Sequence, residues 1–249
     1  MKTNRLYLFI FILLNISAFA QKTKPNTIQE NFKGTVKSMH YKTYEAEKRD
    51  GKIQLKNPSE IGLNVLGLYN KKGYLTEEKQ FTGRNESSII ITTFKYDSKN
   101  LIIEESSAGE TFKYKYVILK NNRYEIRINF PSGSERVTLF DKNGNKFSET
   151  SHSGKKTYYT MTYDYDQFEN NIKTNYINEY YDINEYDNNR NRKKWTRYNM
   201  PDGKLIFIYK TIYTKYDSKG NWLESVDYDI TNDDSNKPLI ITKREIVYF

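Results

Sequence analysis

The chain has 249 residues, no cysteine, two histidines and a formal net charge of +9. The absence of cysteine excludes a disulfide scaffold, a thiolate zinc site, an iron–sulfur cluster and a cysteine nucleophile. Its 23 tyrosines and 13 phenylalanines argue against disorder, because disordered segments are poor in aromatic residues.

The first twenty residues have the pattern of a secretory signal peptide. Lys2 and Arg5 begin it, residues 6–14 are an unbroken apolar run, and residues 18–20 form a small-x-small motif. The alternative, a transmembrane anchor, needs about 20 apolar residues. We therefore expect cleavage after Ala20 and Sec-type export to the periplasm, the cell surface or the extracellular space.

The rest of the chain is expected to hold a flexible leader and one folded domain. Residues 21–30 are the expected leader, and residues 31–249 the expected single β-repeat domain, opened by a hairpin over residues 32–55. No later apolar run approaches the length of a spanning helix. We therefore expect no membrane span after cleavage.

A short motif recurs along the domain. An aromatic residue is followed by Asp or Asn, two polar residues, and Gly or another polar residue. Recognisable copies begin at Tyr69, Tyr96, Phe140, Tyr165, Tyr186 and Tyr216, and a degenerate copy begins at Leu119. An Asp can accept a hydrogen bond from the N–H two residues on, and a Gly three positions after it supplies a positive φ. Where Gly is absent an Asn follows, as Asn170, Asn171 and Asn191 do, and Asn tolerates the left-handed region.

Aromatic and β-branched residues alternate with polar ones on both sides of these turns, as in residues 112–118 and 124–130. A period of two predicts half-buried strands. Turns every 10 to 15 residues leave no room for crossover helices, so the strands should pair antiparallel. The predicted fold is all-β: an antiparallel meander of repeated hairpins in an extended, twisted or curled sheet.

Two expectations follow from this sheet. The leading aromatic residues of the motif should share one face and stack between neighbouring copies. The sheet should have two edge strands, one near the N-terminus and one near Phe249. Because an edge invites pairing, residues 240–249 should either pair inside the sheet or form a specific edge for a partner.

The run Tyr216-Asp217-Ser218-Lys219-Gly220-Asn221-Trp222 resembles the YD repeats of the RHS family, and the resemblance covers roughly residues 65–230. It implies long antiparallel sheets that wind into spirals or shells. Some members enclose a toxin, and others lie at cell surfaces and bind glycans or proteins. The chain is short and lacks an autocleavage core domain, so it resembles the small secreted YD-repeat proteins.

One cluster of residues is a candidate binding site. The basic residues Arg190, Arg192, Lys193, Lys194 and Arg197 surround Trp195. Such a mixture can bind an anionic surface, and for an exported protein an anionic glycan is a more natural partner than nucleic acid. The alternative is that the long basic side chains cover an exposed sheet face while Trp195 packs inside.

The other groups of histidine and acidic residues in the sequence do not predict a catalytic or metal site. His40 and His152 are too far apart in sequence for a ligand-spaced pair. The pairs Glu77-Glu78 and Glu104-Glu105 are adjacent strand residues, which point to opposite faces. The acidic stretch 227–234 lacks the spacing of a calcium loop. We expect no enzymatic activity, no cofactor and no metal.

The expected function is that of a secreted or cell-envelope β-repeat protein, a non-catalytic binding or scaffold module for a glycan or protein partner. Alternatives are a purely structural envelope protein, a hydrolase of unfamiliar type and an outer-membrane β-barrel. Against a barrel in lipid, Lys113, Lys115, Glu125 and Arg127 alternate with apolar residues, and a lipid-facing Lys or Arg costs about 2–4 kcal/mol at the midplane. The sequence leaves the oligomeric state open.

Overall fold

A computed structural model of the chain describes residue 26 and residues 30–57, 61–82, 88–119, 123–232 and 237–249. The expected signal peptide, most of the expected leader, and residues 120–122 of the degenerate motif lie outside this described part. Within it there are seventeen strands: β1 (Val36–Arg49), β2 (Lys52–Leu55), β3 (Ile61–Tyr69), β4 (Leu75–Thr82), β5 (Ser88–Tyr96), β6 (Ile102–Ser107), β7 (Glu110–Ile118), β8 (Tyr124–Asn129), β9 (Glu135–Phe140), β10 (Lys146–Ser153), β11 (Lys156–Tyr165), β12 (Asn171–Tyr176), β13 (Tyr180–Tyr186), β14 (Arg192–Asn199), β15 (Leu205–Tyr216), β16 (Trp222–Asp229) and β17 (Lys237–Tyr248).

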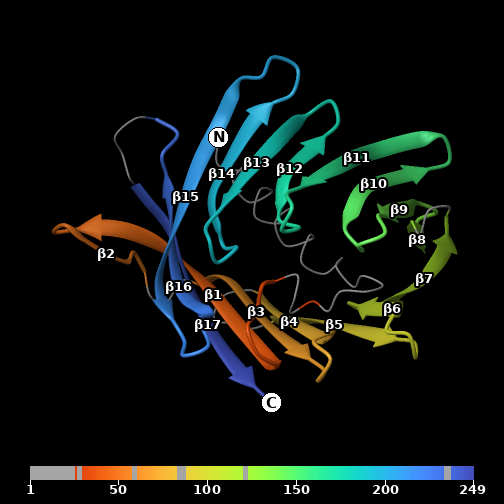
Figure 1. The fold of residues 1–249 in the computed structure, drawn as a ribbon, viewed down its shortest axis with the longest axis horizontal. Helices are drawn as coiled ribbons and strands as arrows, with labels where there is room; N and C mark the ends of the chain where they lie inside the picture. Colours follow the sequence, from red (N-terminus) through yellow and green to blue (C-terminus); the bar gives the residue numbers. More distant parts are fainter. Residues whose placement is uncertain (1–25, 27–29, 58–60, 83–87, 120–122, 233–236) are drawn as a thin grey trace.

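Sixteen of these strands close into an antiparallel barrel (Figure 1). From β3 to β17 each strand pairs with the next, and β1 pairs with β3 on one side and with β17 on the other. The short strand β2 pairs with the end of β1 and projects from the barrel as a hairpin. In the described residues no helix is long and apolar enough to cross a membrane.

The barrel corrects the predicted open sheet. The two strands expected at its edges pair with each other, from Val36 opposite Tyr248 to Glu45 opposite Ile240. Residues 240–248 therefore pair inside the sheet, the first of the two outcomes expected for the C-terminal strand. Closure satisfies backbone groups that an open sheet would leave unpaired at its edges. The spiral or shell implied by the YD-repeat resemblance is likewise not the arrangement of these strands.

The motif turns have the expected acceptor. The carboxylate Oδ1 of Asp141 accepts hydrogen bonds from the backbone N–H groups of Asn143 and Asn145, both at 2.8 Å. The same two bonds recur at Asn70, Asp97, Asp166, Asp187 and Asp217. One side chain thus satisfies two backbone donors in each turn, which explains why Asp or Asn recurs there.

The left-handed position of the turn is partly as expected. Gly73, Gly144 and Gly220 have positive φ. In two copies without Gly, the positive φ falls on Glu169 and Arg190, so the expectation for the following Asn is wrong there. The amides at positions 170, 191 and 145 instead donate to the second oxygen of the turn Asp, at 2.8, 3.2 and 3.3 Å.

Tyrosine hydroxyls form hydrogen bonds between neighbouring copies of the motif. The Tyr96 hydroxyl donates to the Leu75 carbonyl at 2.6 Å, in the copy before it. The hydroxyls of Tyr186 and Tyr213 make the equivalent bonds to the carbonyls of Asn171 and Arg192, at 3.0 and 2.9 Å. In each case the accepting carbonyl adjoins a β-bulge of the preceding hairpin, where the regular ladder is interrupted.

The leading aromatics follow the one-face prediction with an exception. Tyr69 and Phe140 are buried, at 5% and 2% exposure, and Phe140 stacks on Tyr124 with ring centroids 4.8 Å apart. The burial of these two residues agrees with one shared face. Among the described residues, however, no ring contact joins leading aromatics of neighbouring copies, so the predicted stacking between copies is not observed. Tyr216 is 43% exposed, and Tyr213 makes the bond of that copy instead, so the prediction is wrong at Tyr216.

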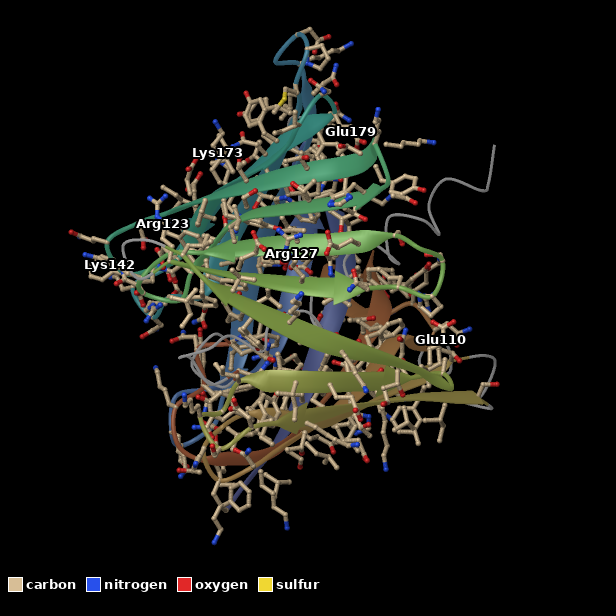
Figure 2. All side chains as sticks on the ribbon, turned by 90° about the vertical axis from the view of Figure 1, so that its right-hand side faces the viewer. Glu110, Arg123, Arg127, Lys142, Lys173 and Glu179 are labelled. Carbon is tan, nitrogen blue, oxygen red and sulfur yellow. The ribbon has the colours of Figure 1, made fainter. Side chains whose placement is uncertain are left out.

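The antiparallel order places the described motif turns at one end of the barrel and the described linking turns at the other. Figure 2 shows Arg123 and Lys142, beside motif turns, opposite Glu110 and Glu179, beside linking turns. We call these ends the motif rim and the linking rim. Side chains alternate between the inner and outer faces. Buried apolar residues form three clusters. Two lie on the inner face of β1, β3–β9 and β17 and include Val36, Phe94 and Ile126. The third joins Ala46, Val226 and Ile241 of β1, β16 and β17 beside β2.

Candidate functional site

Residues 30–35, which we call the strap, lie near the motif rim between the β13–β14 turn and β3. The Asn31 side-chain amide donates to the Asn189 carbonyl at 2.5 Å. Lys33 and Asn221 exchange two hydrogen bonds, at 2.7 and 2.8 Å, between the backbone of one and the side chain of the other. The strap is therefore fastened to the β13–β14 and β15–β16 turns.

The strap also contacts strands β3, β16 and β17 through charged and aromatic side chains. The Tyr69 hydroxyl donates to the Glu30 carboxylate at 3.2 Å. The Arg244 guanidinium lies 5.4 Å from the Phe32 ring and 3.4 Å from the Trp222 ring. Burial raises the pKa of Glu30, although Arg244 and Tyr69 act to lower it. Part of the expected leader is thus enclosed by the barrel.

A second inner carboxyl lies near the strap. Glu78 is opposite the buried Thr92, on the inner face of β4. Burial, together with the charges of Glu30 and Glu105, raises the pKa of Glu78 to about 7. Its charge state therefore changes near neutral pH.

The inner face of β12–β15 carries five aromatic side chains that we call the aromatic wall: Tyr176, Tyr180, Trp195, Phe207 and Tyr209. Phe207 and Tyr209 stack with ring centroids 4.4 Å apart, and Trp195 meets both edge-on at 4.7 and 5.7 Å. Apart from Phe207, these rings are partly exposed, although they face inward. Water therefore reaches the inner surface of this half of the barrel.

Arg197 lies at the centre of the aromatic wall. Its Nε and Nη2 donate to the two carboxylate oxygens of Asp182, at 2.7 and 2.8 Å. Its guanidinium lies 3.8 Å from the Tyr180 ring and 5.1 Å from the Trp195 ring. Burial acts to lower the pKa of Arg197, but Asp182 outweighs it and the pKa is raised. The positive charge is permanent and is matched by a buried carboxylate.

The structure divides the basic cluster singled out in the sequence. Arg192, Trp195 and Arg197 meet on the inner face, because both guanidinium groups lie 5.1 Å from the indole ring. Lys194 points outward to Glu185, at 3.0 Å. Arg190 is in the β13–β14 turn, where its Nε donates to the side chain of Asn170 at 3.1 Å. Lys193 is exposed. These residues do not share one continuous surface.

The partners of this cluster lie on neighbouring strands and are not predicted from the sequence. Tyr180 and Asp182 come from β13, and Phe207 and Tyr209 from β15. Within each strand, inward and outward residues alternate as in a half-buried strand. This alternation is the sequence signal that identifies these residues as inward-facing. Their approach to Arg197 depends on strand register, with Arg197 opposite Asp182 and Phe207, and the turn motifs do not determine that register.

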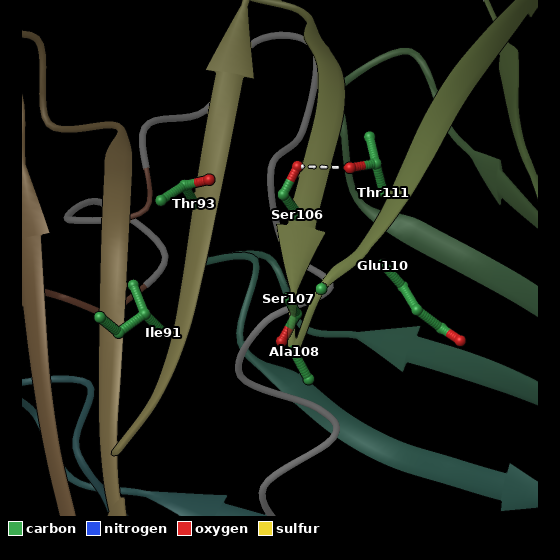
Figure 3. Close-up of a pocket in the computed structure, with 8 residues that line it drawn as sticks. Ile91, Thr93, Ser106, Ser107, Ala108, Glu110 and Thr111 are labelled. Carbon is green, nitrogen blue, oxygen red and sulfur yellow. Dashed lines mark hydrogen bonds between the residues drawn. The ribbon is translucent and has the colours of Figure 1, made fainter.

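A hollow of 230 Å³ lies where the β6–β7 turn meets β5 (Figure 3). Its lining includes Ile91, Thr93, Ser106 and Thr111. The hydroxyls of Ser106 and Thr111 bond to each other at 3.0 Å, and Glu110 is the one ionisable residue among those that line it. This hollow does not bring together the titratable groups that the hydrolase alternative would need.

The outer face of the barrel carries ion pairs around much of its circumference. Lys95 and Glu104 lie 2.6 Å apart between β5 and β6, and Lys215 and Glu224 lie 2.9 Å apart between β15 and β16. Further outer pairs are Lys79 with Glu77, Arg127 with Glu125 and Glu135, and Lys194 with Glu185. In Figure 2, Arg127 and Lys173 lie on the wall between the two rims.

Comparisons with known proteins define the class by fold alone. No family model matches the chain, and no curated protein matches it. Among solved structures it is similar to a porin-like protein from Bacteroides uniformis, with a TM-score of 0.51 and 14% identity over 87% of this chain and 98% of that one. It also matches part of the Tc holotoxin pore of Photorhabdus luminescens, with a TM-score of 0.33 and 13% identity over 73% of this chain and 12% of that one.

The likeness to the porin-like protein supports a similar overall fold. The TM-score to the Tc holotoxin pore is too low to support any conclusion. The protein is thus a closed, all-β antiparallel barrel whose overall fold resembles that of the porin-like protein.

Proposed function

We propose that the chain is an exported cell-envelope barrel that works in water and binds a partner on its inner aromatic wall, without catalysing a reaction. The observation that carries this proposal is the contrast between the two faces of the wall. On the outer face, ion pairs such as Lys95 with Glu104 lie among exposed apolar side chains such as Ile183 and Ile212, while partly exposed aromatic rings line the inner face of β12–β15. The signal-like first twenty residues and the likeness to a porin-like protein support the envelope location.

The outer ion pairs disfavour an outer-membrane position. A membrane barrel presents an apolar band about 25 Å tall to lipid, and a Lys or Arg at the midplane costs about 2–4 kcal/mol. Here charged pairs occur on strands far apart around the barrel, such as β5–β6 and β15–β16. In water, by contrast, such pairs keep the outer wall soluble.

The strap favours a binding module over a channel. A barrel of sixteen strands is wide enough in porins to leave an aqueous channel. In this chain residues 30–35 occupy part of the motif rim, where they are bonded to the β13–β14 and β15–β16 turns and to Tyr69 on β3. A partner would therefore have its freer access to the aromatic wall from the linking rim.

The second candidate is an outer-membrane barrel, which the sixteen-strand closure and the porin-like neighbour favour. A structural envelope role without a small ligand is the remaining alternative. Cell fractionation of the full-length chain, expressed with its own first twenty residues, separates these functions from the proposal. We expect the protein in the soluble exported fraction without detergent. Recovery in the outer membrane, released by detergent alone, would overturn the proposal in favour of the membrane barrel.

Binding is tested with the soluble protein on arrays of glycans and of envelope proteins. We expect a saturable signal that falls when Trp195 is changed to Ala and persists when the outer residue Lys194 is changed to Ala. Circular dichroism of both variants verifies the fold. A soluble, folded protein that binds nothing on either array would favour the structural role instead.

A further inference from the structure

Two guanidinium groups on the inner face form no ion pair with any of the described residues. Arg192 is exposed at the start of β14, and its guanidinium lies 5.1 Å from the Trp195 ring. Arg244 is opposite the inner core residue Tyr41 in the pairing of β1 with β17. Its guanidinium lies 3.4 Å from the Trp222 ring. Each of these positive charges is thus held beside a tryptophan and not beside a carboxylate.

Tyr213, on β15, connects the two groups. Its hydroxyl donates to the Arg192 carbonyl at 2.9 Å, and its ring centroid lies 5.2 Å from that of Trp222. Burial raises the pKa of Tyr213, whereas Arg192 and Arg244 both act to lower it, so both charges act on one hydroxyl. We call Arg192, Trp195, Tyr213, Trp222 and Arg244 the arginine–tryptophan face. It crosses the four adjacent strands from β14 to β17.

Two inner carboxyl groups influence these guanidinium groups from a distance. Asp227 accepts a hydrogen bond from the Thr211 hydroxyl at 2.6 Å, and Glu30 accepts one from a tyrosine of β3 at 3.2 Å. Burial raises the pKa of both carboxyls, although Arg192 acts to lower that of Asp227 and Arg244 that of Glu30. Within the described structure both carboxyls stay outside ion-pair contact, so the face keeps positive charge for an anion.

The face is open to a ligand. Arg192 is exposed, and Trp195, Tyr213 and Trp222 are partly exposed. The planar fork of a guanidinium fits a carboxylate with two parallel hydrogen bonds, and an aromatic ring offers apolar area to the C–H face of a sugar. Neighbouring strands are about 4.8 Å apart, so a face that crosses four strands is longer than one sugar ring.

From these unpaired cations and open rings we propose that the arginine–tryptophan face binds an acidic oligosaccharide. Its anionic group, a carboxylate or a sulfate, is held by Arg192, and the adjoining sugar ring packs against the exposed part of Trp195. A second acidic unit extends past Tyr213 toward Trp222 and Arg244. This inference rests on the proposed function and deepens it, because it names the class of partner and extends the inner binding surface to β16 and β17.

The test titrates the soluble full chain with neutral, uronic-acid and sulfated oligosaccharides of matched length at physiological salt. We expect an acidic panel to bind more tightly than the neutral one, and the panel that binds identifies the anionic group. Arg192→Gln should weaken this binding by about tenfold or more, and Arg192→Lys, which keeps the charge but not the fork, should weaken it less. Lys194→Gln removes one charge from the outer face of the same strand and should leave the affinity unchanged.

The second half of the face is tested by ligand length. Trp222→Phe and Arg244→Gln should weaken the binding of acidic oligosaccharides more than that of the corresponding acidic monosaccharide, because only the longer ligand reaches both guanidinium groups. Comparing two ligands on one variant separates this effect from a general loss of stability, and circular dichroism verifies the fold. An equal loss for both ligands would overturn the extension toward Trp222 and Arg244.

Each contrary result has a distinct meaning. Equal affinity for the neutral and acidic panels would overturn the acidic assignment and leave the proposed binding function standing. Acidic binding that Lys194→Gln weakens as much as Arg192→Gln does would reflect attraction to overall positive charge and would overturn the assigned site. A soluble chain that binds proteins but no saccharide would overturn the saccharide assignment, whereas a chain recovered in the outer membrane would overturn the proposed function itself.

Discussion

The inner face of β3–β9 is a packed core, whereas on β12–β15 the same inward alternation leaves rings partly exposed. In the first half, Val65, Phe94 and Ile126 are 2%, 5% and 4% exposed. In the second half, Trp195 and Tyr180 keep contact with water and surround an ion pair. Both halves use the same turn motif. The motif therefore specifies hairpins, and the inward residues decide whether a half becomes a packed core or a water-accessible aromatic face.

Removing strand β17, whose pairing with β1 closes the barrel, should have the largest effect on stability. Deletion of residues 240–249 removes most of β17 and leaves β1 and β16 with unpaired edges. We expect an unfolded or aggregated protein, measured by size-exclusion chromatography and thermal melting. The matched control removes Phe249 alone, which is 52% exposed. An unchanged melting temperature after the longer deletion would mean that the barrel does not depend on this closure.

The packed half should be more sensitive to truncation than the aromatic wall. Phe140→Ala removes a ring that is 2% exposed and stacked on Tyr124, so we expect a loss of about 3–5 kcal/mol in unfolding free energy. Tyr180→Ala, at a partly exposed ring, should cost about 1–2 kcal/mol. Denaturant unfolding measures both. Equal losses of unfolding free energy in the two variants would contradict the division into a packed half and a partly exposed half.

Variants of the Arg197–Asp182 ion pair test whether charge pairing stabilises the aromatic wall. Arg197→Ala leaves the buried Asp182 carboxylate without its bidentate partner, and we expect a loss of about 3 kcal/mol. The double variant Arg197→Met with Asp182→Leu should recover most of that loss, since it leaves no uncompensated charge. If the double variant were as unstable as the single one, packing around Arg197 rather than its charge would hold the wall together.

The smallest expected effect is the pH dependence of stability that comes from Glu78, the inner carboxyl of the packed half. Because the pKa of Glu78 is raised to about 7, the folded chain favours its protonated form. That contribution to stability is complete below about pH 4.5 and is lost as the pH rises through about 7. Glu78→Gln cannot ionise, so its stability relative to the natural chain should rise by about 2 kcal/mol between those values and then level off.

Unfolding at several pH values measures this difference. Glu77→Gln, one residue away and paired with Lys79 at the outer face, is the control and should show no such rise. A flat difference for Glu78→Gln across the same range would show that this carboxyl does not contribute to pH-dependent stability.

The sequence predicts local features and misses those set by register. The all-β antiparallel class and the acceptor role of Asp141 depend on residues within a few positions of each other. Closure depends on β1 meeting β17, and turn signals are the same in an open sheet and a barrel. The aromatic wall shows the same limit: Trp195 and Arg197 are close in sequence, but Asp182 joins them only through the pairing of β13 with β14.

The pairing of Tyr41 with Arg244 has a kinetic consequence. Strand β1 is made first, yet one of its two partners is the last strand of the chain, so the barrel's final contact has the greatest sequence separation. Contacts of this kind slow folding, because the entropy of the long loop is lost before the pairing repays it. Until β17 arrives, β1 offers an open edge to other chains. The time between synthesis and closure is therefore the period when the chain is most open to pairing with other chains.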